Sequence, residues 1–251
     1  MKKVRISFCG FPGWHVECSA MSMKYLGETF DIHTGGIDHI PVHHTNEIAQ
    51  SEAATGKKFV NYWMHGAFLT SKGEKVSKSK GGLYTIAELE ELGFKPLSYR
   101  YFMFTAHYRM PLDFTLEGLK NAQNSYQRLK NIICELKDDG KLNKKYLKEF
   151  EKAINDDLNM PQALAVLWNL VRDKNAKGKV DTIKEMDKIF SLDLLKKEEI
   201  KISEDVEKLI KEREEARKKK DFKKADSIRE ELKKKGVVLE DTKGGARWKR
   251  I

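Results

Sequence analysis

The chain has 251 residues, and its 48 Lys and Arg against 38 Asp and Glu give a formal net charge of +10 and a pI near 9.3. This excess of lysine indicates a polyanionic partner, because basic faces bind phosphate backbones and attract them from a distance. No apolar run approaches the roughly 20 residues of a membrane span, and three cysteines without a CxxC pair argue against a disulfide framework and for a cytoplasmic protein.

Residues 1 to 84 alternate short apolar runs with Gly turns and helical stretches. This pattern is expected of the second half of a Rossmann-like sheet, which presents an exposed edge where further strands would pair. Within it, the run from His44 to Ala54 predicts a helix that Gly56 closes.

Two helices are expected between residues 85 and 115. Thr85 and Glu88 form a capping box that opens a short helix, and Gly93 ends it. The segment 96 to 108 carries aromatic residues at helical spacing. Stacking on nucleic acid is one interpretation, but a buried helix is favoured, because Tyr and Phe at this spacing usually fill a core.

From residue 113 onward the pattern becomes helical. Apolar residues recur at intervals of three and four from Leu116 to Leu136, and residues 138 to 140 end that helix. Two further helices are expected over Phe150–Leu158 and Pro161–Val171, with a turn rich in Asn and Asp between them.

The tail predicts two charged helices, Ser203–Lys219 and Asp221–Lys235, followed by a β-hairpin that pairs residues 237–239 with 247–250. Trp248 in this hairpin either stacks on a nucleic-acid base or caps a small core. The charge runs by themselves are typical of solvated helix faces.

The most informative motif is KVSKS at residues 75 to 79, which lies between Gly73 and the pair Gly81-Gly82. Lysine is a mobile ammonium donor that can follow a polyphosphate as charge develops, and flanking glycines let such a loop open and close. A solvated surface turn has the same composition in a chain so rich in lysine, so the upstream residues decide between the two.

Upstream lie a thiol, Cys18, and a cluster of imidazoles that ends in His43, with Glu47 four residues later. Residues four apart share a helix face, so His43 and Glu47 can point the same way. Thiolate, imidazole and carboxylate are a normal donor set for zinc, which takes about four ligands. A buried Cys and surface His residues are the alternative explanation.

The order and spacing of these pieces resemble cysteinyl-tRNA synthetase, a class I aminoacyl-tRNA synthetase, from its second half onward. The segments that carry the resemblance are PGWHVECSAM (12–21), FDIHTGGIDHIPVHHTNEIAQSEAATG (30–56), YWMHGAF (62–68), KVSKS, DDLNMPQALAVLWNL (156–170) and KKKDFKKADSIREELKKKGVVLEDTKGGARWKR (218–250).

The resemblance implies zinc bound by Cys18 as the family's second zinc Cys, by His43 and by Glu47, together with a first Cys from an earlier part of the family's catalytic domain. The residues that it implies around ATP and the adenylate are Trp14 and His33 beside the aminoacyl adenylate, Gly35, Gly36 and Asp38 near the adenosine, and Lys78, with Lys75, on the phosphates.

The implied activity is cysteine–tRNA ligation. ATP, with magnesium, and cysteine form cysteinyl adenylate, and tRNA(Cys) then accepts the cysteinyl group without a covalent enzyme intermediate. Zinc would select the substrate thiolate over the hydroxyl of serine. The helical bundle would lie along the tRNA, and Arg247, Trp248 and Arg250 would contact it near the anticodon.

The chain departs from the family ahead of Trp14, where no HIGH-like string occurs. Cys9 does not replace the missing zinc ligand, because it lies just ahead of the PGWH string. The expectation is therefore a carboxy-terminal half, truncated or split, with a separate amino-terminal half as a further partner, and with zinc held weakly or not at all by three donors. Val76 replaces the usual Met of KMSKS, and because both residues are apolar this change puts little in doubt.

The expected fold is an α/β partial Rossmann-like catalytic half (1–84), a connecting helical region (85–115), an α-helical bundle (116–198) and a small α+β carboxy-terminal domain (199–251). Two other functions remain open: a tRNA-binding protein without catalysis, and a cysteine-activating ligase that acts on an amino sugar. The intact donor set and KVSKS disfavour the first, and the basic tail disfavours the second.

Overall fold

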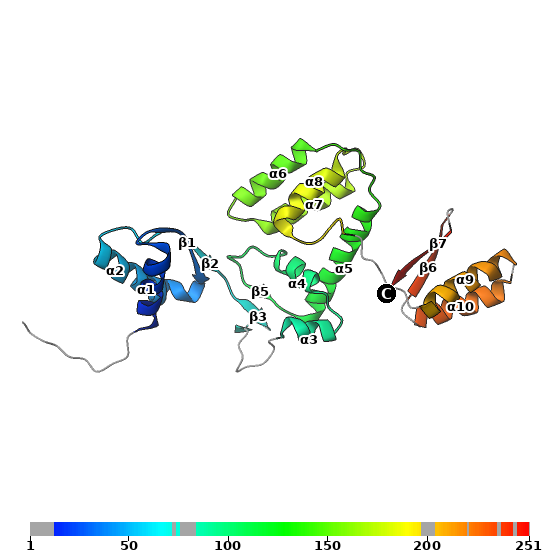
Figure 1. Cartoon of the computed structure of the whole chain (residues 1–251), viewed down its shortest axis with the longest axis horizontal. Helices are drawn as coiled ribbons and strands as arrows, with labels where there is room; N and C mark the ends of the chain where they lie inside the picture. The colour runs from blue at the N-terminus through cyan, green and yellow to red at the C-terminus, as the bar shows by residue number, and fades with distance from the viewer. Residues whose placement is uncertain are drawn as a thin grey trace, which may run out of the picture. The chain divides into compact units, whose positions relative to one another are not determined.

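The computed structural model describes residues 13–71, 74–75, 84–196, 204–219, 221–234, 237–242 and 245–250. The chain forms two compact units, Met1–Lys196 and Lys197–Ile251. Figure 1 shows the helices and strands of each unit. Over the described residues the protein is mostly helical, with three small sheets.

The first unit begins with a layer of two helices on a two-stranded parallel sheet (Figure 1). Strands β1 (Phe30–Gly36) and β2 (Val60–Gly66) pair in register, so that His33 lies beside Trp63 and Gly35 beside His65. Helix α1 (Trp14–Leu26) packs on α2 (Thr45–Thr55).

A 3-10 turn, η1 (Ile37–His39), and one turn of π-helix, η2 (Ile40–His44), lead from β1 into α2. Helix α2 ends at Gly56, whose φ of 67° lies in the left-handed region. The helix that we predicted over residues 44 to 54 is therefore confirmed within one residue.

The second part of this unit is a three-stranded sheet, β3 (Leu69–Ser71), β4 (Glu74–Lys75) and β5 (Leu112–Asp113), in the order β4-β3-β5. Helix α3 (Ile86–Glu91) begins with the predicted capping box, because Thr85 accepts from the Glu88 amide and Glu88 accepts from the Thr85 amide. Helix α4 (Pro96–Met103) buries Tyr101 and Phe102, so the core interpretation of its aromatic residues is confirmed.

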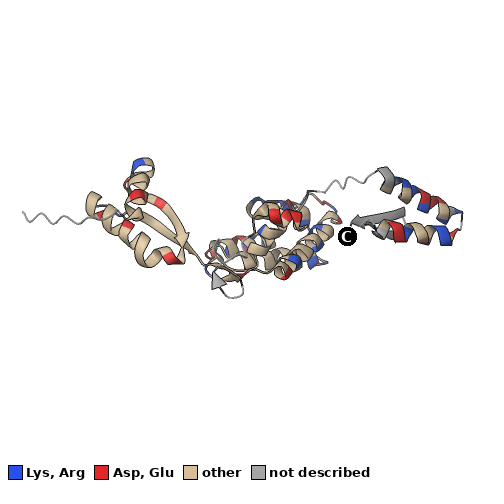
Figure 2. Ribbon diagram, turned by 90° about the horizontal axis from the view of Figure 1, so that it is seen from below, with Lys and Arg blue, Asp and Glu red and all other residues tan. Residues whose placement is uncertain are grey.

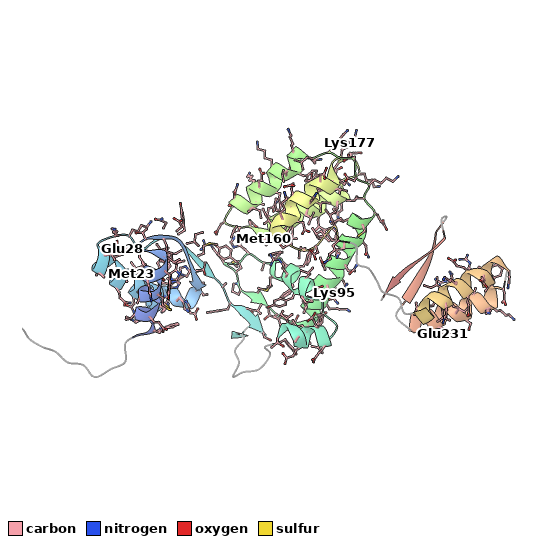
Figure 3. All side chains as sticks on the ribbon, viewed as in Figure 1. Met23, Glu28, Lys95, Met160, Lys177 and Glu231 are labelled. Atoms are coloured by element: carbon pink, nitrogen blue, oxygen red, sulfur yellow. The ribbon has the colours of Figure 1, made fainter. Side chains whose placement is uncertain are left out.

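The helical bundle provides the main apolar core, with its side chains filling the space between the helices (Figure 3). Its helices are α5 (Leu116–Cys134), α6 (Lys144–Asn155), α7 (Met160–Arg172) and α8 (Lys179–Phe190). Trp168 Nε1 donates to Tyr101 Oη at 2.9 Å, which ties α4 to α7. Buried Tyr126 Oη donates to the Leu192 carbonyl at 2.6 Å, which ties the segment after α8 to α5.

Two sequence expectations for the bundle were wrong. Helix α6 begins at Lys144 rather than Phe150, because the Asn143 side chain accepts from the Tyr146 amide as an N-cap. It also ends earlier than Leu158, since Asp157 and Leu158 have positive φ. Helix α8 was not predicted, although Ile183, Met186 and Phe190 recur at helical spacing and are all buried.

The second unit is a helical hairpin followed by a β-hairpin. Helices α9 (Glu204–Lys218) and α10 (Phe222–Lys234) match the predicted charged helices, and Asp221 caps α10 by accepting from the Lys224 amide at 3.1 Å. Charged residues of both signs occur along both helices (Figure 2). The two helices share a small apolar core that includes Val206, Ile228 and Leu232.

Strands β6 (Val237–Thr242) and β7 (Gly245–Arg250) pair antiparallel with Leu239 opposite Trp248. The predicted hairpin is confirmed, and its strands are longer than expected. In the part of the chain that the structure describes, no helix is long and apolar enough to cross a membrane. The four-part division at residues 84, 115 and 198 remains a prediction.

Candidate metal and adenylate site

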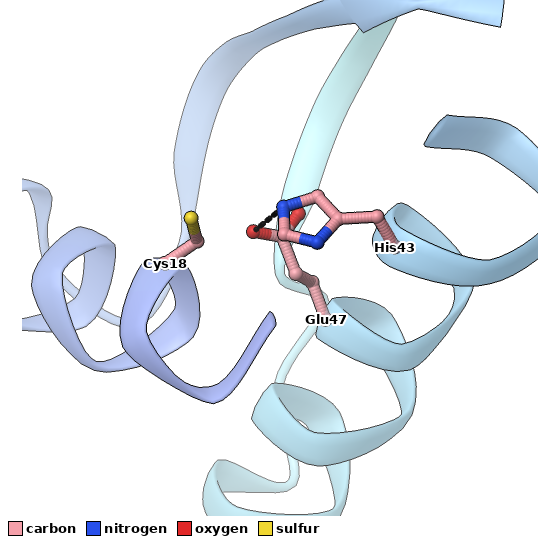
Figure 4. Close-up of side chains that lie close together, drawn as sticks. All are labelled: Cys18, His43 and Glu47. Carbon is pink, nitrogen blue, oxygen red and sulfur yellow. Dashed lines mark ion pairs between the residues drawn. The ribbon is translucent and has the colours of Figure 1, made fainter. Parts of the chain in front are cut away.

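Three side chains converge where α1 packs on η2 and α2. Cys18 lies on α1, His43 lies in the π-helical turn η2, and Glu47 lies in the first turn of α2 (Figure 4). Glu47 follows His43 by four residues and His44 by three, so its side chain lies on the helix face between those of the two histidines. The packing of α1 on α2 then brings the thiol opposite this face.

The geometry of this group suits a metal ion. The ligand atoms of Cys18, His43 and Glu47 all lie within 4.8 Å of one another, and His43 Nε2 is 3.4 Å from Glu47 Oε1. Glu47 is fully buried, and its Oε1 makes no hydrogen bond. A buried carboxylate oxygen that lacks a hydrogen bond is costly unless something else compensates it. Thiolate, imidazole and carboxylate are the donors that zinc prefers, so these residues fit it.

The electrostatics of this group are those of closely packed donors. Burial raises the pKa of the Cys18 thiol, and the nearby Glu47 carboxylate adds to that shift. Burial lowers the pKa of His43, against the opposing effect of Glu47. His43 is thus held as the neutral imidazole that a metal requires, whereas Cys18 must lose its proton on binding.

A second group of imidazoles lies on the other side of Glu47. His33 Nε2 is 2.9 Å from Glu47 Oε2, and His44 Nε2 is 3.9 Å from the same oxygen. His44 Nδ1 in turn lies 2.8 Å from His65 Nε2 on β2. Burial and the neighbouring histidines lower the pKa of His44 to about 4, so it is neutral near pH 7.

The predicted adenylate residues surround these groups. Trp14 is 58% exposed, and its indole lies 4.0 Å, centroid to centroid, from the imidazole of His43. A Cβ at Gly35 would come within 2.5 Å of His44 Cε1, and one at Gly36 within 2.4 Å of Asp38 Oδ1. Glycine at both positions therefore allows these side chains to approach β1 closely.

The remaining predicted residues are placed only in part. Lys75 lies in β4, where it pairs with Thr70, and Lys78 falls outside the described residues. Arg247, Trp248 and Arg250 lie in β7. Their roles in binding phosphate and tRNA stay predictions.

Sequence reasoning did not assign a role to His44, His65 or Trp63. The imidazole of His33 packs on that of His44 and on the indole of Trp63, with centroids 4.7 and 4.8 Å apart. The sequence signal that could have identified Trp63 and His65 is their spacing of two residues in a strand, which places both side chains on one face of the sheet.

Three family profiles match the chain in order. Residues 8–124 match the profile described as tRNA synthetases class I (C) catalytic domain, residues 149–196 match a DALR domain, and residues 201–248 match the cysteinyl-tRNA ligase anticodon binding domain. Together they span the two compact units.

Several relatives align with nearly the whole chain. Cysteine–tRNA ligase 1 of Burkholderia lata is 47% identical over 242 residues, which cover 95% of this chain and 52% of that protein. The cysteine–tRNA ligase of Brachyspira hyodysenteriae is 42% identical over 267 residues, covering 96% of this chain and 56% of that protein. The cysteine–tRNA ligase of Treponema denticola is 41% identical over 279 residues, which cover 96% of this chain and 57% of that protein.

The chain thus spans about half the length of the curated relatives it matches. Among solved structures, it is similar to a LeuRS of Agrobacterium radiobacter K84 in a ternary complex with tRNA and LeuAMS, with a TM-score of 0.48 and 14% identity over 64% of this chain and 26% of that one. This likeness is too weak to bear on the fold. The ordered profiles and the relatives are sufficient, and the chain belongs to the cysteinyl-tRNA synthetase family of class I aminoacyl-tRNA synthetases.

Proposed function

We propose that this chain supplies the metal site, the KVSKS loop and the tRNA-binding parts of a cysteine–tRNA ligase, on a catalytic portion that is part of a Rossmann-like domain. The observation that carries the proposal is the cluster of Cys18, His43 and Glu47, whose ligand atoms lie within 4.8 Å of one another in a chain of this family. A protein that only binds tRNA has no use for such a buried donor set.

The three donors would hold zinc, which when bound offers a site that prefers a thiolate to a neutral hydroxyl. Glu47 is the ligand most easily loosened when a substrate thiolate enters, because a carboxylate oxygen is the weakest of the three donors. Trp14, exposed beside His43, would cover the bound amino acid, and Gly35, Gly36 and Asp38 would lie along the adenosine. Shape alone separates serine from cysteine poorly, so these donors supply the specificity.

Catalysis would come from positioning and charge. Lys78, with Lys75, would neutralise the phosphates of ATP and its magnesium as pyrophosphate leaves, and no group of the enzyme becomes covalently attached. The 3′ end of tRNA(Cys) would then take the cysteinyl group from the adenylate. The DALR and anticodon-binding matches support tRNA as the acceptor and disfavour an amino sugar.

The test is cysteine-dependent exchange of pyrophosphate into ATP. The chain alone should show none, because its 251 residues contain no HIGH-like string. Mixing it with the part of the Burkholderia relative that this chain does not align with should restore exchange. Cys18→Ala should abolish the restored activity.

A matched pair of lysine variants tests the KVSKS loop in the same mixture. Lys78→Ala should lower the restored exchange sharply, whereas Lys177→Ala, which removes an exposed lysine of the bundle (Figure 3), should leave it unchanged. Exchange that is equal with serine and cysteine would contradict selection by a thiolate. Absence of exchange in the mixture as well as in the chain alone would count against the ligase.

A further inference from the structure

The two oxygens of Glu47 have different surroundings. Oε1 lies toward His43 and Cys18 and makes no hydrogen bond, whereas Oε2 lies 2.9 Å from His33 Nε2. The carboxylate is fully buried, so water does not compete for either oxygen. Its orientation therefore depends on the groups that contact it.

The contact with His33 has a defined direction. An ionised carboxylate has no proton to donate, so His33 must carry its proton on Nε2 and donate it to Oε2. A hydrogen bond to a charged acceptor is stronger than one between neutral groups, and a buried one is stronger still. Rotation of the carboxylate about its last bond would break this hydrogen bond and turn Oε1 away from Cys18.

The ring of His33 is itself held in place. It packs against the imidazole of His44, 4.7 Å away, and the indole of Trp63, 4.8 Å away, and those two rings are themselves 4.7 Å apart. The ring of Phe30 lies 5.5 Å from His33 on another side of the cluster. His44 is fixed in turn by its 2.8 Å contact with His65. A donor anchored on strand β1 and packed against rings from two further elements is suited to orienting another side chain.

We propose that His33 is a positioning residue of the metal site: its Nε2–H holds Glu47 Oε2, so that Oε1 faces Cys18 and His43 and is ready for a metal ion. This inference rests on the proposed metal site and deepens it. The resemblance placed His33 beside the aminoacyl adenylate, whereas the geometry points to a role through Glu47.

A competing arrangement uses the same atoms. His33, His44 and Glu47 also have ligand atoms within 4.8 Å of one another, so the alternative is a Glu47 that bridges two metal ions, one on each oxygen. The 2.9 Å separation of His33 Nε2 from Oε2 is an ordinary hydrogen-bond length and needs no ion between the two atoms. The experiment must therefore count metal ions as well as measure affinity.

The experiment is a zinc titration of the full chain against a competing chelator, with the bound zinc counted. We expect one zinc per chain and about 10- to 100-fold weaker binding in His33→Leu, as is usual when the partner of a ligand is removed. His33→Gln, whose amide nitrogen reaches the place of Nε2, should recover most of the affinity. His33→Asn, whose amide is too short to reach Glu47, should not.

His39→Leu is the matched control. It removes an imidazole of the same cluster, whose ring packs 5.1 Å from those of His43 and His44, and it should leave zinc affinity nearly unchanged. If His33→Leu does not fold, the comparison of the Gln and Asn variants decides. Equal affinity of these two variants, or two zinc ions per chain with one lost in His33→Leu, would overturn the proposal.

A second readout needs no metal. The nitrogen chemical shifts of His33 in the zinc-free chain should show the proton on Nε2 rather than Nδ1. If the wild-type chain binds no zinc up to millimolar concentration, its three donors are too few to hold the metal by themselves, but the His33 tautomer still reports on the hydrogen bond to Glu47. A proton on Nδ1 would overturn the positioning role whatever the zinc result.

Discussion

Gly35 lies where two imidazoles meet strand β1. A Cβ at this position would come within 2.5 Å of His44 Cε1 and 2.8 Å of His39 Nδ1. His44 has little room to move, because it is buried and its Nδ1 contacts His65 Nε2. The absence of a side chain at Gly35 thus allows the imidazole layer behind Glu47 to form.

Gly35→Ala should therefore destabilise the first unit by about 1 to 3 kcal/mol, the usual cost of forcing an extra carbon into a packed site. Thr34→Ala is the control, because Thr34 is the exposed neighbour on the opposite face of β1. Urea unfolding followed by tryptophan fluorescence measures both. A cost for Thr34→Ala as large as that for Gly35→Ala would show that the strand, and not the imidazole contact, is responsible.

At the scale of elements, the loop after α4 connects the sheets to the bundle. Tyr108 accepts at its carbonyl from the Ala67 amide at 2.8 Å, and its hydroxyl donates to Asp157 Oδ1 at 2.6 Å. Arg109 Nη2 donates to the same oxygen at 3.1 Å, and His107 Nε2 lies 2.9 Å from the Asp157 carbonyl. The turn between α6 and α7 is thereby held to the end of β2.

These contacts lower the pKa of Asp157 to about 2, with the hydrogen bond from Arg109 as the largest cause. A carboxyl whose pKa is lower in the folded than in the unfolded chain stabilises the fold above its unfolded pKa, near 4. That stabilisation is lost as the pH falls from about 4 through 2. Asp157→Asn removes the titrating group and should remove this part of the acid sensitivity.

The measurement is the urea midpoint of wild type and Asp157→Asn at pH 5 and at pH 2.5. We expect wild type to have the higher urea midpoint at pH 5. The difference between the two midpoints should become smaller at pH 2.5. Asp156→Asn is the neighbouring control, since the Asp156 carboxylate faces Asn159 rather than Arg109. A difference that stays constant over this pH range would exclude the ion pair as its cause.

At the scale of the whole molecule, the two compact units contain different candidate functional residues. The first contains the donor cluster and the bundle, and the second combines the charged helices α9 and α10 with the β6–β7 hairpin. The second unit contains the match to an anticodon binding domain, so we expect the proposed tRNA binding to depend mainly on this unit. Phosphate contacts from lysine and arginine make such binding depend on salt.

Deletion of residues 200–251 should therefore weaken binding to the cognate tRNA far more than Lys78→Ala does. Fluorescence anisotropy at two salt concentrations measures both changes. Equal tRNA affinity of the full chain and the deletion would reject a role of this unit in tRNA binding, and its charge would then serve solvation.

Within this unit, Trp248→Ala should cost about 1 to 3 kcal/mol of binding if the indole stacks on a base, and the loss should depend on the anticodon sequence. Arg247→Ala and Arg250→Ala should instead weaken binding to all tRNAs alike and flatten the salt dependence. Identical losses for cognate and non-cognate tRNA in Trp248→Ala would contradict stacking on a specific base.

The sequence by itself determined the elements whose signals are local. The Thr85 capping box, the Gly56 stop and the Asp221 cap each predicted a helix end that the structure confirms, because caps act within one turn. The ordered motifs also identified the family. The start of α6 was missed although Asn143 caps it and the buried residues Tyr146, Phe150 and Ala153 recur at helical spacing.

Only the tertiary structure decided how the site is assembled. His33 contacts Glu47 across 14 residues of chain and His44 contacts His65 across 21, pairings that depend on the register of β1 with β2 and on the approach of η2 and α2 to the sheet. No spacing rule relates such residues. The sequence could name the donors of the metal site, but the side chains that orient Glu47 became visible only when a strand and a helix were packed together, because their contacts are set by packing and not by the local chain.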